Sequence, residues 1–145
     1  MSIANEVQNV VSLLSAAAGL ERRLTLTLSN IRGVSFSEYR LLQALSARSN
    51  GSAMRVELAA AVGLTPSAVT RALKPLEKLG YVSTAKSERD ARRSLAVLTP
   101  GGRELLSDTE TVVSEVVQSL ALDAADLRCL ARVAGALQRT RATHP

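Results

Sequence analysis

The sequence predicts a mainly α-helical fold with one small β-hairpin, which is of the α+β class. Apolar residues make up 46% of the 145 residues but aromatic residues only 2%, so the core must consist of Leu, Val and Ala side chains. Such a core favours close helix packing. Apolar residues recur at helical spacing along most of the chain, and the pattern changes to that of strands only between residues 81 and 99. A chain of this length forms one ordinary domain or a small domain with helical extensions.

The N-terminal third of the chain predicts two helices. Helical spacing of apolar residues predicts a long first helix from Ile3 to Leu28, followed by a break around Gly33. Either Ser35 or Ser37 can cap a second helix, which ends at the turn-like sequence 49–52.

The middle of the chain has the spacing of a helix-turn-helix. After an extended piece at 54–56, a brief helix at 57–62 contains Ala59, a residue small enough for two helices to cross closely. Gly63 tolerates the left-handed geometry of the turn, and Val69 anchors the second helix, which extends to residue 79.

The C-terminal half predicts a hairpin followed by two long helices. Two short strands at 81–87 and 94–99 are joined by a charged turn at 88–93. A fifth helix begins at Thr99-Pro100, and a sixth begins at Asp123 and runs to about residue 140. A hairpin directly after a helix-turn-helix predicts a winged helix-turn-helix.

The second helix of this motif is expected to recognise DNA. Thr65 caps it with Pro66 at its first position, and Pro75 is expected to bend it beyond the reading surface. At about 100° per residue, hydroxyl and cationic side chains fall on one face without any acid. Hydroxyls and Lys can reach phosphates, and Arg can bind guanine in the major groove, whereas an ordinary surface helix would mix charges. The expected recognition residues are Thr65, Ser67, Thr70, Arg71, Lys74 and Lys78, and the expected core residues on the opposite face are Val69, Ala72, Leu73, Leu76 and Leu79.

The hairpin turn is expected to form a cationic wing. Three arginines, Arg89, Arg92 and Arg93, lie close together in it, and the negative potential of the minor groove attracts arginine. Asp90 would be a poor DNA contact, so we expect it to hold an arginine, Arg92, in an extended pose. The alternative is a solvated charged turn.

The charge distribution agrees with a polyanionic partner. The net charge is +5, and residues 54–99 contribute eight basic and four acidic residues of the total. No apolar run is long enough for a membrane span, and the only cysteine, Cys129, excludes an intrachain disulfide, so we expect a cytoplasmic protein.

Catalysis is not expected. The sequence has no nucleophile–base pair, no phosphate-binding glycine loop and no paired acids near a histidine. The single histidine, His144, lacks partners for a metal, so neither a metal nor a cofactor is predicted. Cys129 is expected to be a small residue at a helix interface, and the alternative is a redox role beside Arg128.

Three stretches resemble the MarR (multiple antibiotic resistance regulator) family of winged helix-turn-helix transcription factors. They are FSEYRLLQAL, ELAAAVGLTPSAVTRALKPLEKLGYV and RDARRSLAVLTPGGREL, with the pair Asp90-x-Arg92 in the last. The resemblance implies a DNA-binding domain at residues 35–106 and a helical dimerisation region at residues 1–34 and 107–145. It gives the recognition role to Ser67, Thr70, Arg71 and Lys74, and the wing role to Arg92.

The resemblance also implies how such a regulator works. The expected function is sequence-specific regulation of transcription, as a repressor, by a homodimer bound to a pseudo-palindromic operator of double-stranded DNA. A small phenolic or other anionic effector is implied, but its binding residues are unknown, and only Phe36, Tyr39 and Tyr81 supply aromatic rings. The alternative is a winged-helix module that binds protein or RNA.

Overall fold

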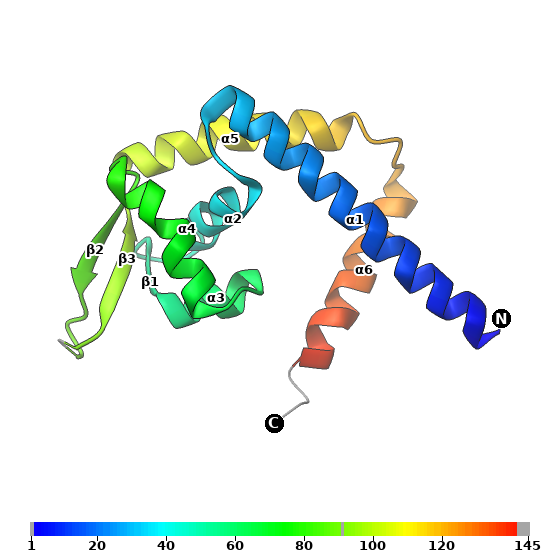
Figure 1. The fold of residues 1–145 in the computed structure, drawn as a ribbon, viewed down its shortest axis with the longest axis horizontal. Coiled ribbons are helices and arrows are strands. Elements are labelled where there is room, and N and C mark those ends of the chain that lie inside the picture. The colour runs from blue at the N-terminus through cyan, green and yellow to red at the C-terminus, as the bar shows by residue number, and fades with distance from the viewer. Residues whose placement is uncertain (1, 91, 142–145) are drawn as a thin grey trace. The chain divides into compact units, whose positions relative to one another are not determined.

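The computed structural model describes residues 2–90 and 92–141 (Figure 1). These form two compact units, at residues 1–114 and 115–145, and α5 crosses from the first to the second. The helices are α1 (Ile3–Arg32), α2 (Phe36–Ser46), α3 (Arg55–Val62), α4 (Pro66–Lys78), α5 (Pro100–Gln118) and α6 (Ala124–Arg141), and the strands are β1 (Ser52–Met54), β2 (Val82–Lys86) and β3 (Ser94–Leu98). The predicted class, mainly helical with a small β component, is confirmed, and the predicted hairpin is part of a small antiparallel sheet.

The sheet has one strand more than the predicted hairpin. Its order is β1-β3-β2, and both pairs are antiparallel, with Ala96 of β3 opposite Ala53 on one side and Thr84 on the other. The extended piece expected at 54–56 is therefore wrong by two residues. The Glu57 side chain accepts a hydrogen bond from the Met54 N–H at 3.2 Å, which begins α3 already at Arg55 and leaves residues 52–54 to pair with β3.

Local capping determines where α1 ends and where α2 begins. α1 continues past Leu28 to Arg32, one turn longer than predicted, and ends at Gly33. Of the two candidate caps for α2, the structure uses Ser35: its hydroxyl accepts from the Glu38 N–H, and the Glu38 carboxylate accepts from the Ser35 N–H, both at 3.1 Å. Burial raises the pKa of the Glu38 carboxyl, and the hydrogen bond from Ser35 opposes that effect.

The helix-turn-helix has the predicted geometry. Gly63 ends α3 with φ +71°, a left-handed conformation that is strained for residues with a side chain. Ala59 is 5% exposed and accepts at its carbonyl from the Leu64 N–H at 3.1 Å, and Val69 of α4 is fully buried. The small residue, the turn glycine and the apolar anchor therefore act as the spacing predicts.

The core of the first unit gathers mostly leucine and valine from its helices and sheet. Its largest fully buried side chains include Leu28, Leu41, Leu42, Leu45, Leu58, Val69, Leu73, Leu76 and Val82. Four of the five predicted core residues of α4 are buried or half-buried, but Leu79 is 66% exposed. Leu79 lies beyond the last residue of α4, where the chain turns through Gly80, so its side chain leaves the apolar stripe.

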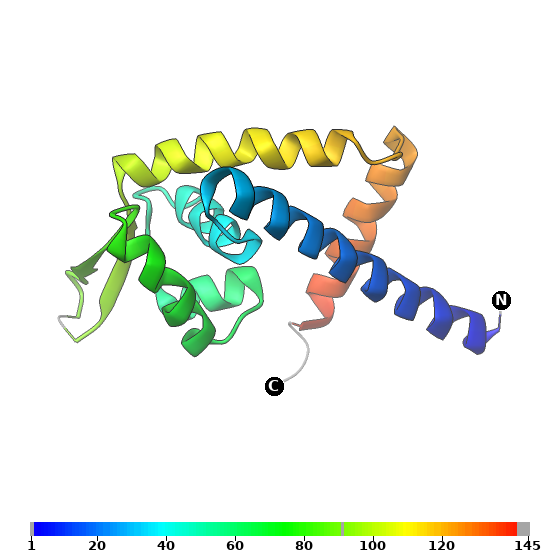
Figure 2. The ribbon, with the colours of Figure 1, turned by 45° about the horizontal axis from the view of Figure 1, so that its top comes forward.

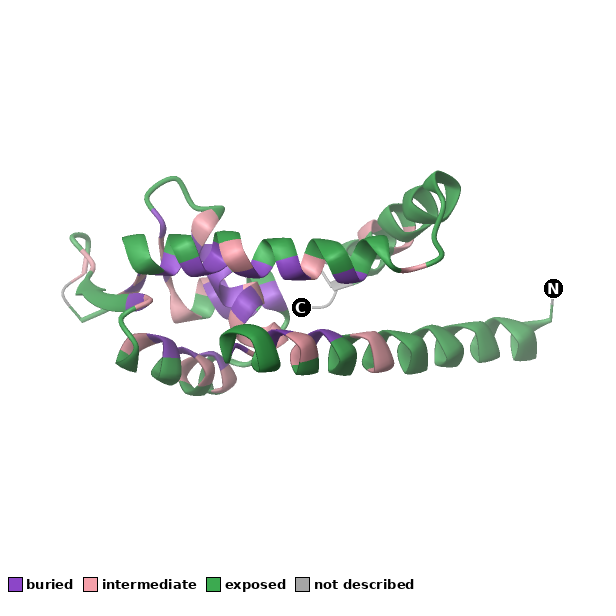
Figure 3. Cartoon of the chain, turned by 90° about the horizontal axis from the view of Figure 1, so that it is seen from above, coloured by how far each residue is buried: buried purple, intermediate pink, exposed green. Residues whose placement is uncertain are grey.

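The N-terminal half of α1 carries apolar side chains that the chain leaves exposed (Figure 3). These side chains are Ile3, Val7, Val10, Val11, Leu13 and Leu14.

The second unit contains α6. Its N-terminus has the predicted cap, since Asp123 accepts from the Asp126 N–H at 2.8 Å and Asp126 accepts from the Asp123 N–H at 3.1 Å. Along the chain that the structure describes, none of the helices is both long and apolar enough to cross a membrane.

Candidate nucleic-acid interface

The α4 helix presents the predicted recognition residues on one surface. Ser67, Arg71, Lys74 and Lys78 are exposed, and Thr70 is half-buried. Two hydroxyls serve the helix itself: Thr65 accepts from the Ala68 N–H at 3.1 Å as the N-cap, and Thr70 donates to the Pro66 carbonyl at 3.0 Å. The polar groups of this set that remain free to contact a ligand are therefore those of Ser67, Arg71, Lys74 and Lys78.

The helix continues through Pro75 as a single α-helix. The bend expected there stays a prediction. Leu76, one residue later, is almost fully buried, so the packing half of α4 does turn its apolar side to the core.

The wing is the β2–β3 hairpin, which lies beside α4 and extends from the helices of its unit (Figures 1 and 2). Arg89, Arg92 and Arg93 are all exposed on the turn.

The partner of Asp90 differs from the prediction. Its carboxylate accepts from the backbone N–H of Arg92 at 3.0 Å, and its ion pair, at 3.7 Å, is with the Arg93 guanidinium. Asp90 therefore closes the turn around Arg92 and holds the side chain of Arg93, not that of Arg92. Sequence spacing alone does not distinguish the two arginines, because the direction of each side chain depends on the turn conformation.

An open groove of about 500 Å³ lies between the wing and α4. It is lined by Ser67 and Thr70 of α4, by Arg93 and Ser94 at the start of β3, and by Met54, Arg55, Val56 and Pro66. The structure thus brings residues 67 and 93, which are far apart in the sequence, to one concave surface.

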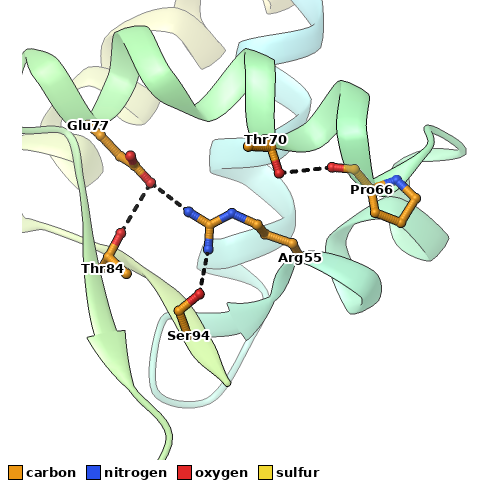
Figure 4. A network of polar contacts seen from close by, with 6 residues as sticks. All are labelled: Arg55, Pro66, Thr70, Glu77, Thr84 and Ser94. Atoms are coloured by element: carbon orange, nitrogen blue, oxygen red, sulfur yellow. Dashed lines mark hydrogen bonds and ion pairs between the residues drawn. The ribbon is translucent and has the colours of Figure 1, made fainter. Parts of the chain in front are cut away.

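A polar network beside this groove was not predicted (Figure 4). The Arg55 guanidinium donates to the Glu77 carboxylate and to the Ser94 hydroxyl, both at 3.0 Å, and the Thr84 hydroxyl donates to the same Glu77 oxygen at 3.2 Å. We call these four residues the Arg55–Glu77 cluster. The only hint in the sequence is that Glu77 falls at the edge of the otherwise acid-free face of α4.

The acidic, histidine and cysteine side chains give no metal site within the described residues. Within residues 2–90 and 92–141, no three His, Cys, Asp or Glu side chains gather to hold a metal ion, and His144 lies outside the described residues. Cys129 is exposed on α6 with the Arg132 guanidinium 3.9 Å from its sulfur.

The family comparison identifies the motif. A sequence model described as the MarR family matches residues 32–93, from the end of α1 to the wing. No curated protein matches the chain. The predicted resemblance to the MarR family of transcriptional regulators is confirmed, because the winged helix-turn-helix segment matches that family's model.

Solved structures share this fold over nearly the whole chain. Sco3205, a MarR family transcriptional regulator from Streptomyces coelicolor solved in complex with DNA, is 26% identical, with a TM-score of 0.82 over 100% of this chain and 91% of that one. A mutant of MarR from E. coli, complexed with operator DNA, is 22% identical, with a TM-score of 0.78 over 94% and 99%. BpsR from Bordetella bronchiseptica, whose DNA binding is regulated by 6-hydroxynicotinic acid, is 18% identical, with a TM-score of 0.77 over 100% and 99%.

Proposed function

We propose that this protein is a cytoplasmic repressor that binds a pseudo-palindromic operator in double-stranded DNA as a homodimer and acts by binding, not by catalysis. The observation that carries the proposal is the surface of α4, which offers the Ser67 hydroxyl and three cations without an exposed acid and lies next to a wing with three exposed arginines. The DNA complexes of Sco3205 and of the E. coli protein support it, because both have this fold.

The exposed side chains have different roles in this proposal. Ser67, Thr70, Arg71 and Lys74 enter the major groove, with Arg71 as the residue that reads a base. Lys78, at the end of α4, binds a phosphate, and Arg92 of the wing enters the adjacent minor groove.

Replacing Arg71 by alanine should change specificity, whereas replacing Lys78 by alanine should change only affinity. Loss of a base contact is expected to lower binding by about 1–3 kcal/mol and to relax base choice at one operator position. Loss of a phosphate contact should weaken binding to all sequences alike and lower the salt slope by about one. Operator fragments captured from genomic DNA by the wild-type protein provide the duplexes for this measurement. Equal, uniform losses in both variants would make Arg71 a phosphate contact.

The apolar side chains that α1 leaves exposed support the proposed dimer. Apolar side chains that gather on one exposed helix typically mark an interaction site. We propose that residues 1–34 and 107–145 dimerise, so that residues 35–106 of two subunits address the two operator half-sites.

Light scattering at micromolar concentration should give twice the 15.3 kDa mass of one chain. Leu14→Asp places a charge on the exposed apolar stripe, where Leu14 is 64% exposed, and should produce monomers. Ser12→Asp adds the same charge on an exposed residue about 160° from Leu14 and about 100° from Leu13 around α1, and should leave the dimer intact. A monomeric wild-type protein would contradict the proposal.

The proposal includes relief of DNA binding by a small anionic molecule, as the regulation of BpsR suggests. Two of the three aromatic rings lie together in α2, where Phe36 and Tyr39 stack with their centroids 5.8 Å apart. Titrating the DNA complex with 6-hydroxynicotinic acid and with small phenolic acids tests this part, and release of DNA is the expected result.

A further inference from the structure

The Arg55–Glu77 cluster connects four elements that the DNA-binding surface depends on. Arg55 is the first residue of α3, Glu77 lies in the last turn of α4, Thr84 is in the middle of β2, and Ser94 begins β3 directly after the wing arginines. The Glu77 carboxylate and the Arg55 guanidinium therefore connect α4 to both strands of the wing through hydrogen bonds.

The cluster is more than a solvent-exposed ion pair. The side chains of Arg55 and Glu77 are only 23% and 31% exposed, and each makes a second hydrogen bond that fixes its direction. Exposed pairs contribute little because water and chain entropy compete with them, whereas a partly buried, charge-assisted network holds its members in one geometry. By contrast, the Asp90–Arg93 pair at the wing turn is 3.7 Å long, with side chains 46% and 62% exposed.

The position of Glu77 in α4 also indicates a structural role. It lies at the edge of the cationic face of α4, where an unpaired carboxylate would repel DNA phosphates. Arg55 offsets this charge, and it also lines the groove between α4 and the wing. An acidic side chain at this position is unfavourable for DNA binding, so its presence indicates that it stabilises the structure of the binding surface.

We propose that the Arg55–Glu77 cluster positions the wing relative to the recognition helix, so that both can contact DNA at once. This inference rests on the proposed function. Glu77 and Arg55 are positioning residues: they set the angle of the β2–β3 hairpin against α4 through Thr84 and Ser94, and Arg92 then reaches the minor groove beside the base contacts of α4.

Removing the Glu77 carboxylate separates positioning from electrostatics. Electrostatics alone predicts that Glu77→Ala binds DNA more tightly, because a negative charge near phosphate is lost. Positioning predicts weaker binding, by about 5-fold or more, which is the contribution of one specific contact. Glu77→Gln keeps an oxygen that can accept from Arg55 and Thr84, and should recover most of the affinity. Glu88→Ala removes the same charge from the exposed wing turn, outside the cluster, and should bind as tightly as wild type or more tightly.

A double-mutant cycle of Glu77 and Arg92 shows whether Glu77 affects DNA binding through the wing. Arg92→Ala should weaken operator binding less in the Glu77→Ala background than in the wild type, because a wing that is no longer held contributes less. All variants are compared at one salt concentration and at a temperature at which thermal unfolding shows each to be folded, so that lost stability does not count as lost binding.

Two results would overturn the inference while leaving the proposed function intact. One is a Glu77→Ala protein that binds operator as tightly as Glu88→Ala, even if Arg55→Ala binds weakly, since Arg55 would then be a phosphate contact. The other is an equal effect of Arg92→Ala in both backgrounds. A wild-type protein that binds no duplex DNA even at low salt would overturn the proposed function itself, together with this inference.

Discussion

Replacing Leu73 by alanine is expected to lower the free energy of unfolding by about 2–5 kcal/mol. Leu73 lies in the middle of α4 and its side chain is 0% exposed in the core of the first unit. Truncation removes buried apolar contacts and leaves a cavity that the surrounding helices fill only in part. Chemical denaturation followed by circular dichroism measures the change as a shift of the transition midpoint at constant slope.

Leu79→Ala is the matched control. The side chain is the same and belongs to the same stretch of chain, but it is 66% exposed, so the expected change is within about 0.5 kcal/mol. Equal losses in the two variants would show that Leu79 is covered, as the sequence pattern predicts and the structure does not. A small loss at Leu73 would place it outside the core.

Gly102→Ala is expected to destabilise the protein by about 1–3 kcal/mol, the range for overpacking. A Cβ at this position would overlap the backbone carbonyl oxygen of Tyr81 and lie 2.7 Å from Cδ1 of Leu98. Here the first turn of α5 passes against the base of the wing, and Thr99 fixes the approach. Its hydroxyl accepts from the Gly102 N–H at 3.0 Å and shares its proton between the carbonyl oxygens of Gly80, at 2.7 Å, and Tyr81, at 3.0 Å. Because the obstacle is backbone, a rotamer change cannot relieve it.

Gly101→Ala, one residue earlier, separates this clash from the helical preference of alanine. Its Cβ would meet only Thr99 Oγ1 at 3.8 Å and Tyr81 Cδ1 at 4.0 Å, which are ordinary contacts. Alanine favours the helix by up to about 1 kcal/mol over glycine, so this variant should be as stable as wild type or more stable. Thermal unfolding of both proteins decides the matter: a Gly102→Ala protein that melts at the wild-type temperature would contradict the close approach of α5 to Tyr81.

The sequence by itself determined the features that depend on neighbours along the chain. The order of helices, the left-handed turn at Gly63 and the reciprocal cap of Asp123 and Asp126 each depend on residues within a few positions, and spacing reveals them. The cationic face of α4 is local in the same sense, because helical periodicity alone places Arg71 and Lys74 together.

Helix ends and strand starts were less well determined. The apolar stripe of α4 predicts a buried Leu79, but the turn at Gly80 ends the helix first. The extended piece predicted at 54–56 lies two residues too late, and its pairing with β3 was not predicted, because β1 is only three residues long and is stabilised by a strand over forty residues later.

The tertiary structure alone decided which distant side chains meet. No pattern in the sequence pairs Arg55 with Glu77, or chooses Arg93 over Arg92 as the partner of Asp90, because each contact depends on the conformations of turns and on side-chain direction. The need for glycine at position 102 is of the same kind, since the atoms that exclude a Cβ belong to Tyr81 and Leu98. Local propensity and periodicity act over a few residues, whereas these contacts form only when packing of the whole core has brought separate segments within a few ångströms of each other.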